Sequence, residues 1–360
     1  MGKNNLYKTR IAYLDLLRIL SGLLVVMVHV SAQQMENAQV MSDTYVITNA
    51  FNCLAFSGVA LFVMISGALA LSPDREAGIK ELLLRRTLRF FALYYIWKAI
   101  YQAVLMIETG KPFTWINIKN EIILALVQQR GYYHLWFLPM IAIVYMAVPL
   151  IRKGTADRNV CRYFLCVFFV TALLFPTLFH YEFKFKYLFV DFFAANDFGF
   201  FGGYLGYFIL GHWFHQWGND ISKRKKRFLY IAGGAAFVSA CALGVLASRR
   251  IGEPSYIMNT PFAVTTFFTV AAIFAAVQSA GGKREPSERV GKALRFGADR
   301  VLGIYLLHPL VVNLFRAAGF DASICSPILS IPLVTAAVFL VSGLISTVFS
   351  KIPVIGRLVR

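Results

Sequence analysis

Charged residues are scarce in this chain of 360 residues. They make up 15% of the sequence, against about 25% in a typical soluble domain. Hydrophobic residues make up 58%, and the mean hydropathy is +0.62. A soluble globular protein this apolar would leave too much hydrocarbon facing water, so that class is excluded. The composition instead predicts an all-α, polytopic membrane protein.

The sequence also lacks internal repeats and linkers, and its cysteines do not have the spacing of metal ligands. The five cysteines are scattered, mostly within apolar runs, so we expect small core residues and no metal site. No repeat or shift in composition divides the chain, which predicts a single transmembrane domain over residues 1–360.

Acidic residues are half as numerous as basic ones, and the net charge is +18. In a soluble protein this excess would favour a nucleic-acid partner. In an apolar chain it indicates loops on the cytoplasmic side of a membrane, which collect Lys and Arg. We therefore expect a lipid bilayer as the surroundings and no nucleic acid.

Spanning helices need about 20 mostly apolar residues. The sequence predicts about ten of them, near residues 11–31, 48–71, 88–107, 133–151, 160–179, 198–217, 228–247, 259–280, 299–316 and 327–349. With a cytoplasmic N-terminus, 26 Lys and Arg lie in cytoplasmic segments and 8 in external loops. This asymmetry predicts that both termini are cytoplasmic.

Ionisable residues within a span are costly and indicate function. The first helix carries Asp15, Arg18 and His29. Arg18 and His29 are close to three helical turns apart, so they share a face with a rise of about 16 Å between them, and Asp15 can pair with Arg18. The alternatives are an arginine that reaches the headgroups and a histidine that bonds across helices.

Further polar and aromatic groups lie at or within other spans. Arg86 and Arg89 begin the third helix, either as anchors at the cytoplasmic face or as a clamp for phosphate. Ser66 and Gly67 form a small pair that permits close packing or a bound ligand. The remaining candidates line a cavity or bind an acceptor: Tyr133, His134, Trp136, Tyr305 and His308. Because Pro309 follows His308, we also expect a break in that helix.

A histidine with several arginines on membrane helices suits acyl transfer. A histidine of near-neutral pKa can remove a proton from a hydroxyl, and arginines can hold the phosphates of a coenzyme A thioester. The pantetheine arm of that donor is similar in length to the rise from Arg18 to His29.

In five segments, taken in order, the chain resembles the membrane acyltransferase type 3 family of bacterial cell-envelope O-acyltransferases. They are Asp15-x2-Arg18-x10-His29, the stretch 62–67, Arg86-x2-Arg89, the stretch 133–137 with Tyr145 and Pro149, and the stretch 303–309. Among members, the chain most resembles the stand-alone type that O-acetylates enterobacterial common antigen.

The resemblance implies a multi-pass protein of the bacterial cytoplasmic membrane. It implies acetyl-CoA as acyl donor, a hydroxyl of an envelope glycan or lipid-linked sugar as acceptor, and no metal. It also implies that His29 is the central catalytic residue, as general base or acyl carrier. Arg18 and Asp15 are the further catalytic residues of this hypothesis. The residues expected to bind acyl-CoA are Arg18, Arg86, Arg89 and Ser66. The alternatives are a transporter or exporter of a polysaccharide or small solute, and a structural subunit or sensor of an envelope complex. The sequence leaves the oligomeric state open.

Overall fold

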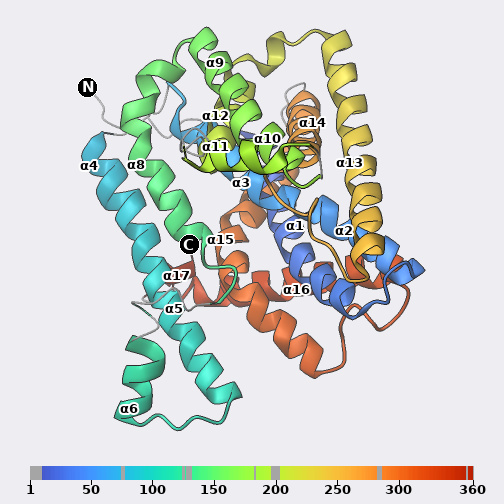
Figure 1. Cartoon of the computed structure of the whole chain (residues 1–360). Helices are drawn as coiled ribbons and strands as arrows, with labels where there is room; N and C mark the ends of the chain where they lie inside the picture. The colour runs from blue at the N-terminus through green and yellow to red at the C-terminus, as the bar shows by residue number, and fades with distance from the viewer. Residues whose placement is uncertain are drawn as a thin grey trace, which may run out of the picture. The chain divides into compact units, whose positions relative to one another are not determined.

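The protein is built from long helices. The computed structural model describes residues 10–73, 78–123, 126, 132–181, 184–195, 203–281, 286–353 and 356–359, and these residues form helices and loops without a strand (Figure 1). Nine helical stretches among them are long and apolar enough to cross a membrane, which confirms nine predicted spans: Ala12–Asn37, Asp43–Ala70, Ile79–Glu108, Phe137–Thr155, Arg158–Leu178, Lys223–Ile251, Val264–Gly281, Glu288–Ala317 and Pro327–Phe349.

The predicted span over 198–217 is only partly described. Helix α12 (Tyr204–Trp217) has 14 residues, which corresponds to about 21 Å of rise and falls short of the ~20 residues that a span needs. Residues 198–202 lie outside the described part of the chain. The remaining spans have the predicted order, with ends that differ by up to eleven residues.

Contacts divide the chain into two compact units, and each is described by itself. The first unit comprises residues 1–69 and 158–360, and the second comprises residues 70–157. The single transmembrane domain expected over residues 1–360 stays a prediction.

The first unit contains most of the helices. They are α1 (Ala12–Asn37), α2 (Asp43–Ala55), α3 (Ser57–Ala70), α9 (Arg158–Phe168), α10 (Phe175–Leu178), α11 (Lys186–Ala195), α12, α13 (Lys223–Ile251), α14 (Val264–Gly281), α15 (Glu288–Ala317), α16 (Pro327–Phe349) and α17 (Gly356–Val359), with the π-helical turn Phe169–Leu174 between α9 and α10 and the 3₁₀ turn Gly218–Asp220 after α12. The last residue of α3 belongs to the second unit.

Helix α1 is the central helix of the first unit, because it contacts α2, α14, α15 and α16. Val26 and Val30 of α1 share a buried cluster with Ile304 and Val311 of α15 and with Val338 of α16. Burying such side chains stabilises a fold by about 1.5–3 kcal/mol each in water, and in lipid the same positions contribute close packing. The packing sets α1 beside α15.

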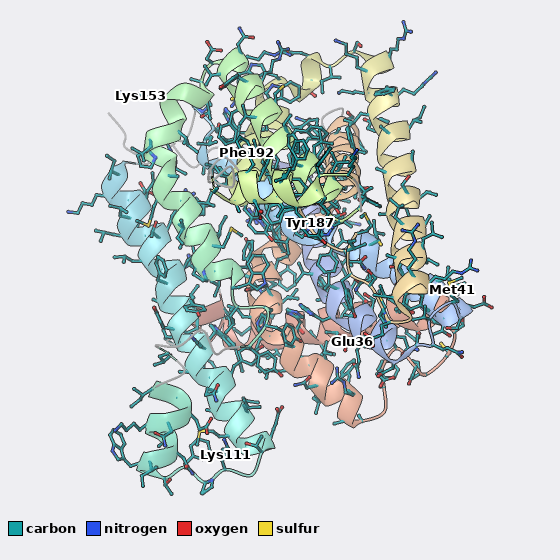
Figure 2. The ribbon with its side chains drawn as sticks, viewed as in Figure 1. Glu36, Met41, Lys111, Lys153, Tyr187 and Phe192 are labelled. Carbon is teal, nitrogen blue, oxygen red and sulfur yellow. The ribbon has the colours of Figure 1, made fainter. Side chains whose placement is uncertain are left out.

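Two helices of the first unit carry exposed apolar side chains. Leu340 and Leu344 of α16 are exposed, as are Tyr187, Leu188 and Phe192 of α11. Figure 2 labels Tyr187 and Phe192 on α11, which is too short to span a membrane. Exposed leucines on a long helix suit lipid tails, and exposed aromatic rings suit the headgroup boundary.

The second unit is built on two long helices. The first runs from Ile79 to Glu108 and combines α4 (Ile79–Glu81), the π-helical turn Leu82–Thr87 and α5 (Leu88–Glu108). The second is α8 (Phe137–Thr155), which contacts both the π-helical turn and α5. The short elements α6 (Trp115–Asn117) and Ile118–Ile123 complete the unit.

Candidate active site

Asp15 is buried in the first turn of α1 and binds two arginines. Arg10 Nε donates to its Oδ2 at 2.8 Å, and Arg18 Nη1 lies 3.6 Å from its Oδ1. The spacing of three residues predicts the second of these pairs. A carboxylate is stable in a buried position only when it is paired, so the two arginines explain why an acid occurs here.

Arg10 is a residue that sequence reasoning missed. Its Nη2 also lies 2.6 Å from Asp299 Oδ1 on α15, and this hydrogen bond raises the pKa of Arg10 above its ordinary value. Arg10 therefore joins the beginning of α1 to α15. The sequence shows only a basic residue before a span, and no local pattern connects it with an acid on a helix near the other end of the chain.

His29 and His308 are brought together by the packing of α1 on α15. Their imidazole rings stack with centroids 5.1 Å apart and an angle of 26° between the planes. His308 is fully buried, and His29 is half-buried. Tyr305, one turn before His308, is buried as well, with its ring 6.3 Å from that of His308. Three of the predicted site residues thus lie in one place.

The proline after His308 fixes which ring nitrogen of His308 carries a proton. A proline has no N–H, so Pro309 leaves the carbonyl of Tyr305 without its normal helical donor. His308 Nδ1 lies 2.8 Å from that carbonyl and 3.1 Å from the carbonyl of Ile304. Because a carbonyl only accepts, Nδ1 carries the proton in the neutral ring, and Nε2 carries the lone pair.

The break that we expected at Pro309 is absent. Helix α15 runs without interruption from Glu288 to Ala317. The histidine donates the hydrogen bond that the proline cannot, so the helix continues through the site.

A buried amide beside His29 is a second residue that the sequence did not reveal. Asn52 of α2 donates from Nδ2 to Ser31 Oγ at 2.9 Å and to the carbonyl of Val28 at 3.3 Å. Its Oδ1 accepts from Asn259 Nδ2 at 2.6 Å. Asn52 therefore holds the two residues that flank the turn bearing His29, and an isolated asparagine on an apolar helix gives no sequence signal for this role.

Ser66 lies beside a close approach between two helices. A side chain at Gly67 of α3 would overlap the backbone of Phe208 on α12, and one at Gly211 of α12 would overlap the backbone of Met64 on α3. The two glycines thus let the two backbones touch, as the small pair at 66–67 predicts. Ser66 itself is half-buried.

In the second unit, Arg86 stacks on an aromatic ring. Its guanidinium carbon lies 5.3 Å from the centroid of Tyr145 on α8, and the ring of Phe90 stacks on the same tyrosine at 5.8 Å. Arg86 is half-buried, whereas Arg89 is exposed. Arg86 lies within the π-helical turn Leu82–Thr87, and Arg89 lies in α5.

His134 is buried among tyrosines just before α8 begins. Its ring lies 5.0 Å from Tyr101, 5.8 Å from Tyr133 and 5.9 Å from Tyr132, in edge-on arrangements. The ring of Trp136 is partly exposed and lies 6.4 Å from that of Phe137. The role of Tyr133, His134 and Trp136 in lining a cavity or binding an acceptor stays a prediction.

The predicted residues form three groups. Asp15 and Arg18 lie at the N-terminal end of α1, and His29, Tyr305 and His308 lie further along α1 and α15. Arg86, Arg89, Tyr133, His134 and Trp136 belong to the second unit. A single cavity that joins all of these residues stays a prediction.

The histidine pair has the means for proton transfer. His29 is half-buried, and the unprotonated nitrogen of a neutral imidazole can accept the proton of a hydroxyl. The neutral His308 ring presents a lone pair at Nε2, so it acts there as an acceptor.

Comparison with known proteins shows the family of the chain. The sequence profile described as an acyltransferase domain matches residues 11–347, which is nearly the whole chain. Among curated proteins and among solved structures, none matches the chain. The matched region covers most of both units and every site residue predicted from the sequence. The chain is therefore a polytopic membrane protein that belongs to the acyltransferase type 3 family.

Proposed function

We propose that the protein transfers an acetyl group from cytoplasmic acetyl-CoA to a hydroxyl of a cell-envelope glycan. In this proposal the protein is located in the bacterial cytoplasmic membrane. The acceptor class is a polysaccharide or a lipid-linked sugar, and enterobacterial common antigen is the example that the sequence resemblance offers. The observation that carries the proposal is the half-buried His29 stacked on His308 at the junction of α1 and α15.

His29 can act as a general base. Its unprotonated nitrogen takes the proton of the acceptor hydroxyl while the oxygen attacks the thioester carbonyl. The carbon–oxygen bond forms, the carbon–sulfur bond breaks, and the coenzyme A thiolate leaves with the proton that His29 has taken. Developing negative charge on the carbonyl oxygen needs a donor. Tyr305 can donate, whereas the neutral His308 ring has its proton at Nδ1 and Arg18 lies about 16 Å from His29 along α1.

His29 can alternatively carry the acetyl group itself. The imidazole nitrogen then attacks the thioester, coenzyme A leaves, and the acceptor hydroxyl displaces the histidine in a second step. On the expected topology, Arg18 is toward the cytoplasm and His29 toward the outside, so either route passes the acyl group along α1. Arg18, Arg86, Arg89 and Ser66 bind the donor in this proposal.

The test is transfer of labelled acetyl by the purified protein in detergent. Acetyl-CoA is supplied with two glycan fractions from bacterial envelopes, one polysaccharide and one lipid-linked, and release of free coenzyme A is followed in parallel. Variant His29→Ala is compared with the wild type, and His180→Ala, an exposed loop histidine, is the matched control. We expect a loss of about 10²–10⁴-fold in kcat for His29→Ala, which is the range for general base catalysis, and no change for the control.

The outcomes are distinct. Full turnover by His29→Ala contradicts the assigned role of this residue. Failure of the wild type to bind or consume acetyl-CoA contradicts the proposal that acetyl-CoA is the acyl donor. In the absence of acceptor, protein-bound label that forms on the wild type but not on His29→Ala, and that acid or hydroxylamine releases, supports the acyl-histidine route over the general base.

A further inference from the structure

A pocket of about 540 Å³ lies where α1 and α15 both begin. Its wall includes residues 10–13 before and within the first turn of α1, and residues 286–288 at the start of α15. Ligand sites in proteins have volumes of about 300–1,000 Å³, so this pocket has the size for part of a cofactor-sized molecule. It belongs entirely to the first unit.

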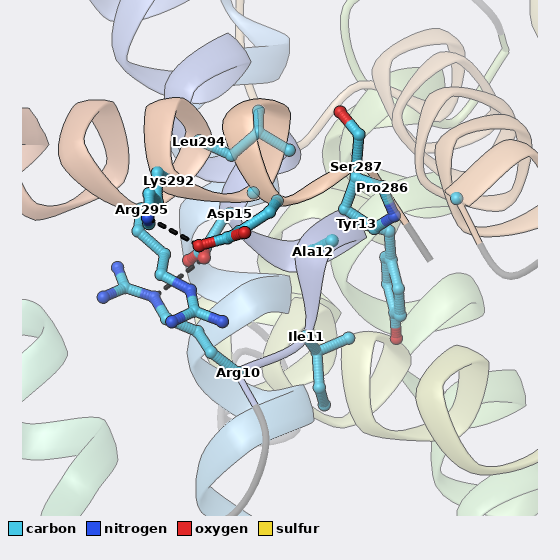
Figure 3. A pocket seen from close by; sticks show the side chains of 13 residues that line it. Arg10, Ile11, Ala12, Tyr13, Asp15, Pro286, Ser287, Lys292, Leu294 and Arg295 are labelled. Carbon is cyan, nitrogen blue, oxygen red and sulfur yellow. Dashed lines mark hydrogen bonds and ion pairs between the residues drawn. The ribbon is translucent and has the colours of Figure 1, made fainter. Parts of the chain in front are cut away.

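The pocket wall is basic on one side. Figure 3 shows the side chains of Arg10, Lys292 and Arg295 close together, with Tyr13 on the opposite side. Arg10 is engaged by Asp15 and Asp299. Lys292 pairs with Glu288 at 2.6 Å, and both side chains are mostly exposed, so this pair contributes at most ~1 kcal/mol. A ligand with several negative charges therefore competes readily for Lys292 and Arg295.

The backbone adds to this positive potential. The first N–H groups of a helix have no intrahelical acceptor, and the aligned peptide dipoles favour an anion there. The residues that precede the two helices, Ile11 and Ser287, make no capping hydrogen bond through their side chains. Two helix beginnings and three basic side chains thus converge on one pocket.

Two helices lead from this pocket to the histidine pair. Asp15 at the pocket and His29 are fourteen residues apart on α1, a rise of about 21 Å. Arg295 at the pocket and His308 are thirteen residues apart on α15, a rise of about 20 Å. Both helices begin at the pocket and their histidines stack, so they run side by side in the same direction.

The donor has the matching shape. Coenzyme A has a phosphorylated adenosine at one end and a thiol at the other. Its pantetheine arm with the diphosphate is about as long as six extended residues, or roughly 20 Å. A molecule held by its adenosine end in the pocket can therefore bring its thioester to His29.

We propose that this pocket binds the 3′-phosphorylated adenosine end of the acyl-CoA donor. The proposal rests on the proposed function and adds Lys292 and Arg295 to the donor site as phosphate-binding residues. Arg10 is the positioning residue that holds the pocket wall together through Asp15 and Asp299. Tyr13 supplies the aromatic side of the pocket.

The test is a series of ligands measured on the full-length protein in neutral detergent. Coenzyme A, 3′-dephospho-coenzyme A, adenosine 3′,5′-bisphosphate and pantetheine are titrated by calorimetry. The variant is Lys292→Gln with Arg295→Gln, and because both side chains are exposed, we expect the fold to stay intact. Arg289→Gln is the control, because Arg289 is an exposed arginine of the same helix that does not line the pocket.

We expect the double variant to bind coenzyme A and adenosine 3′,5′-bisphosphate at least about tenfold more weakly, because it loses charge-assisted hydrogen bonds to the phosphates. A tenfold change in affinity corresponds to about 1.4 kcal/mol. The affinity for pantetheine is unchanged. For 3′-dephospho-coenzyme A, the difference in affinity between the variant and the wild type is smaller than for coenzyme A. The KM for acetyl-CoA rises by a similar factor while kcat stays the same. Arg289→Gln behaves like the wild type.

Other results overturn the proposal. Normal coenzyme A binding by the double variant contradicts the assignment of the pocket, but it does not affect the proposed role of His29. Absence of coenzyme A binding by the wild type sinks the proposed function as well. The titrations are repeated with phosphatidylglycerol in the micelles. If the two side chains govern retention of this lipid and not the affinity for coenzyme A, the pocket is a lipid site and the donor assignment is wrong.

Discussion

The imidazole rings of His29 and His308 stack 5.1 Å apart, and the tautomer of His308 is fixed by the carbonyl that Pro309 leaves without a donor. One proline thus affects the histidine pair indirectly. The histidine completes the hydrogen bonding of α15, and its ring is held in place against His29 as a result.

This relationship predicts that the effects of substitutions at His308 and Pro309 are coupled. In His308→Phe, the buried carbonyl of Tyr305 loses its donor, at a cost of about 1–3 kcal/mol. Adding Pro309→Ala returns an N–H to that carbonyl and recovers a large part of the loss. The measurement is unfolding of the single and double variants by SDS in mixed micelles, with Pro309→Ala alone as control. Equal losses with and without Pro309→Ala would contradict the coupling.

Asn52 is expected to matter for both stability and turnover. Asn52→Ala removes hydrogen bonds to Val28, Ser31 and Asn259 within a buried network, whereas Asn259→Ala removes one of them. At ~1 kcal/mol for each bond, Asn52→Ala should destabilise by about 3 kcal/mol and Asn259→Ala by less. Because Asn52 holds the turn of His29, kcat should fall while the KM for acetyl-CoA does not change.

A double-variant cycle checks this prediction. Asn52 and Asn259 share a bond, so their effects on unfolding should be non-additive by at least about 0.5 kcal/mol. Restoring the stability of Asn52→Ala with a bound ligand or lipid should not restore kcat. If it does, Asn52 has a structural role only.

The contact between α3 and α12 predicts a sharp difference between two glycines. In Gly67→Ala, the new methyl group overlaps the backbone of Phe208, and backbone cannot rotate away, so we expect a loss of several kcal/mol, above the ~1–3 kcal/mol of an overpacked side-chain contact. Gly234→Ala is the matched control, because Gly234 lies within α13 with no atom within 4 Å of the added group.

The two variants are compared by thermal unfolding in detergent. Gly234→Ala should be neutral or slightly stabilising, since alanine favours a helix by up to about 1 kcal/mol over glycine. Equal behaviour of the two variants would mean that the helices do not approach as closely as described.

Hydropathy and local spacing predicted much of the fold. Nine spans follow from apolar length alone, and the pair Asp15–Arg18 follows from its spacing of three residues. The exception is the span predicted at 198–217, of which residues 198–202 lie outside the described part of the chain. Its described helix is shorter than predicted.

Contacts between distant helices could not be predicted from the sequence. The bond of Arg10 to Asp299, the stack of His29 on His308 and the network of Asn52 all depend on which helices pack together. Hydropathy gives the number of spans but not their neighbours. Likewise, Pro309 predicted a break because the sequence does not show that a side chain replaces the missing N–H.

The ion pairs at the beginning of α1 lead to a last prediction, in which burial decides the size of the effect. Asp15 is 5% exposed and neutralises Arg10 and Arg18, whereas Asp299 is 50% exposed and, among the described residues, pairs with Arg10. Removing one partner of a buried pair costs about 3–5 kcal/mol. The arginines here reach water in part, so Asp15→Asn should cost about 3 kcal/mol or somewhat less. Asp299→Asn should cost at most about 1 kcal/mol, as exposed pairs do.

Salt separates the two effects. Exposed charges are screened within a Debye length of about 8 Å at physiological ionic strength, and buried ones much less. The small effect of Asp299→Asn on unfolding should therefore vanish in about 1 M salt, where the Debye length falls to about 3 Å, while that of Asp15→Asn remains. Glu288→Gln, which breaks the exposed pair with Lys292, is the surface control and should leave stability unchanged. If Asp15→Asn loses its effect in salt as well, the carboxylate is not buried and cannot be the residue that organises the arginines at the beginning of α1.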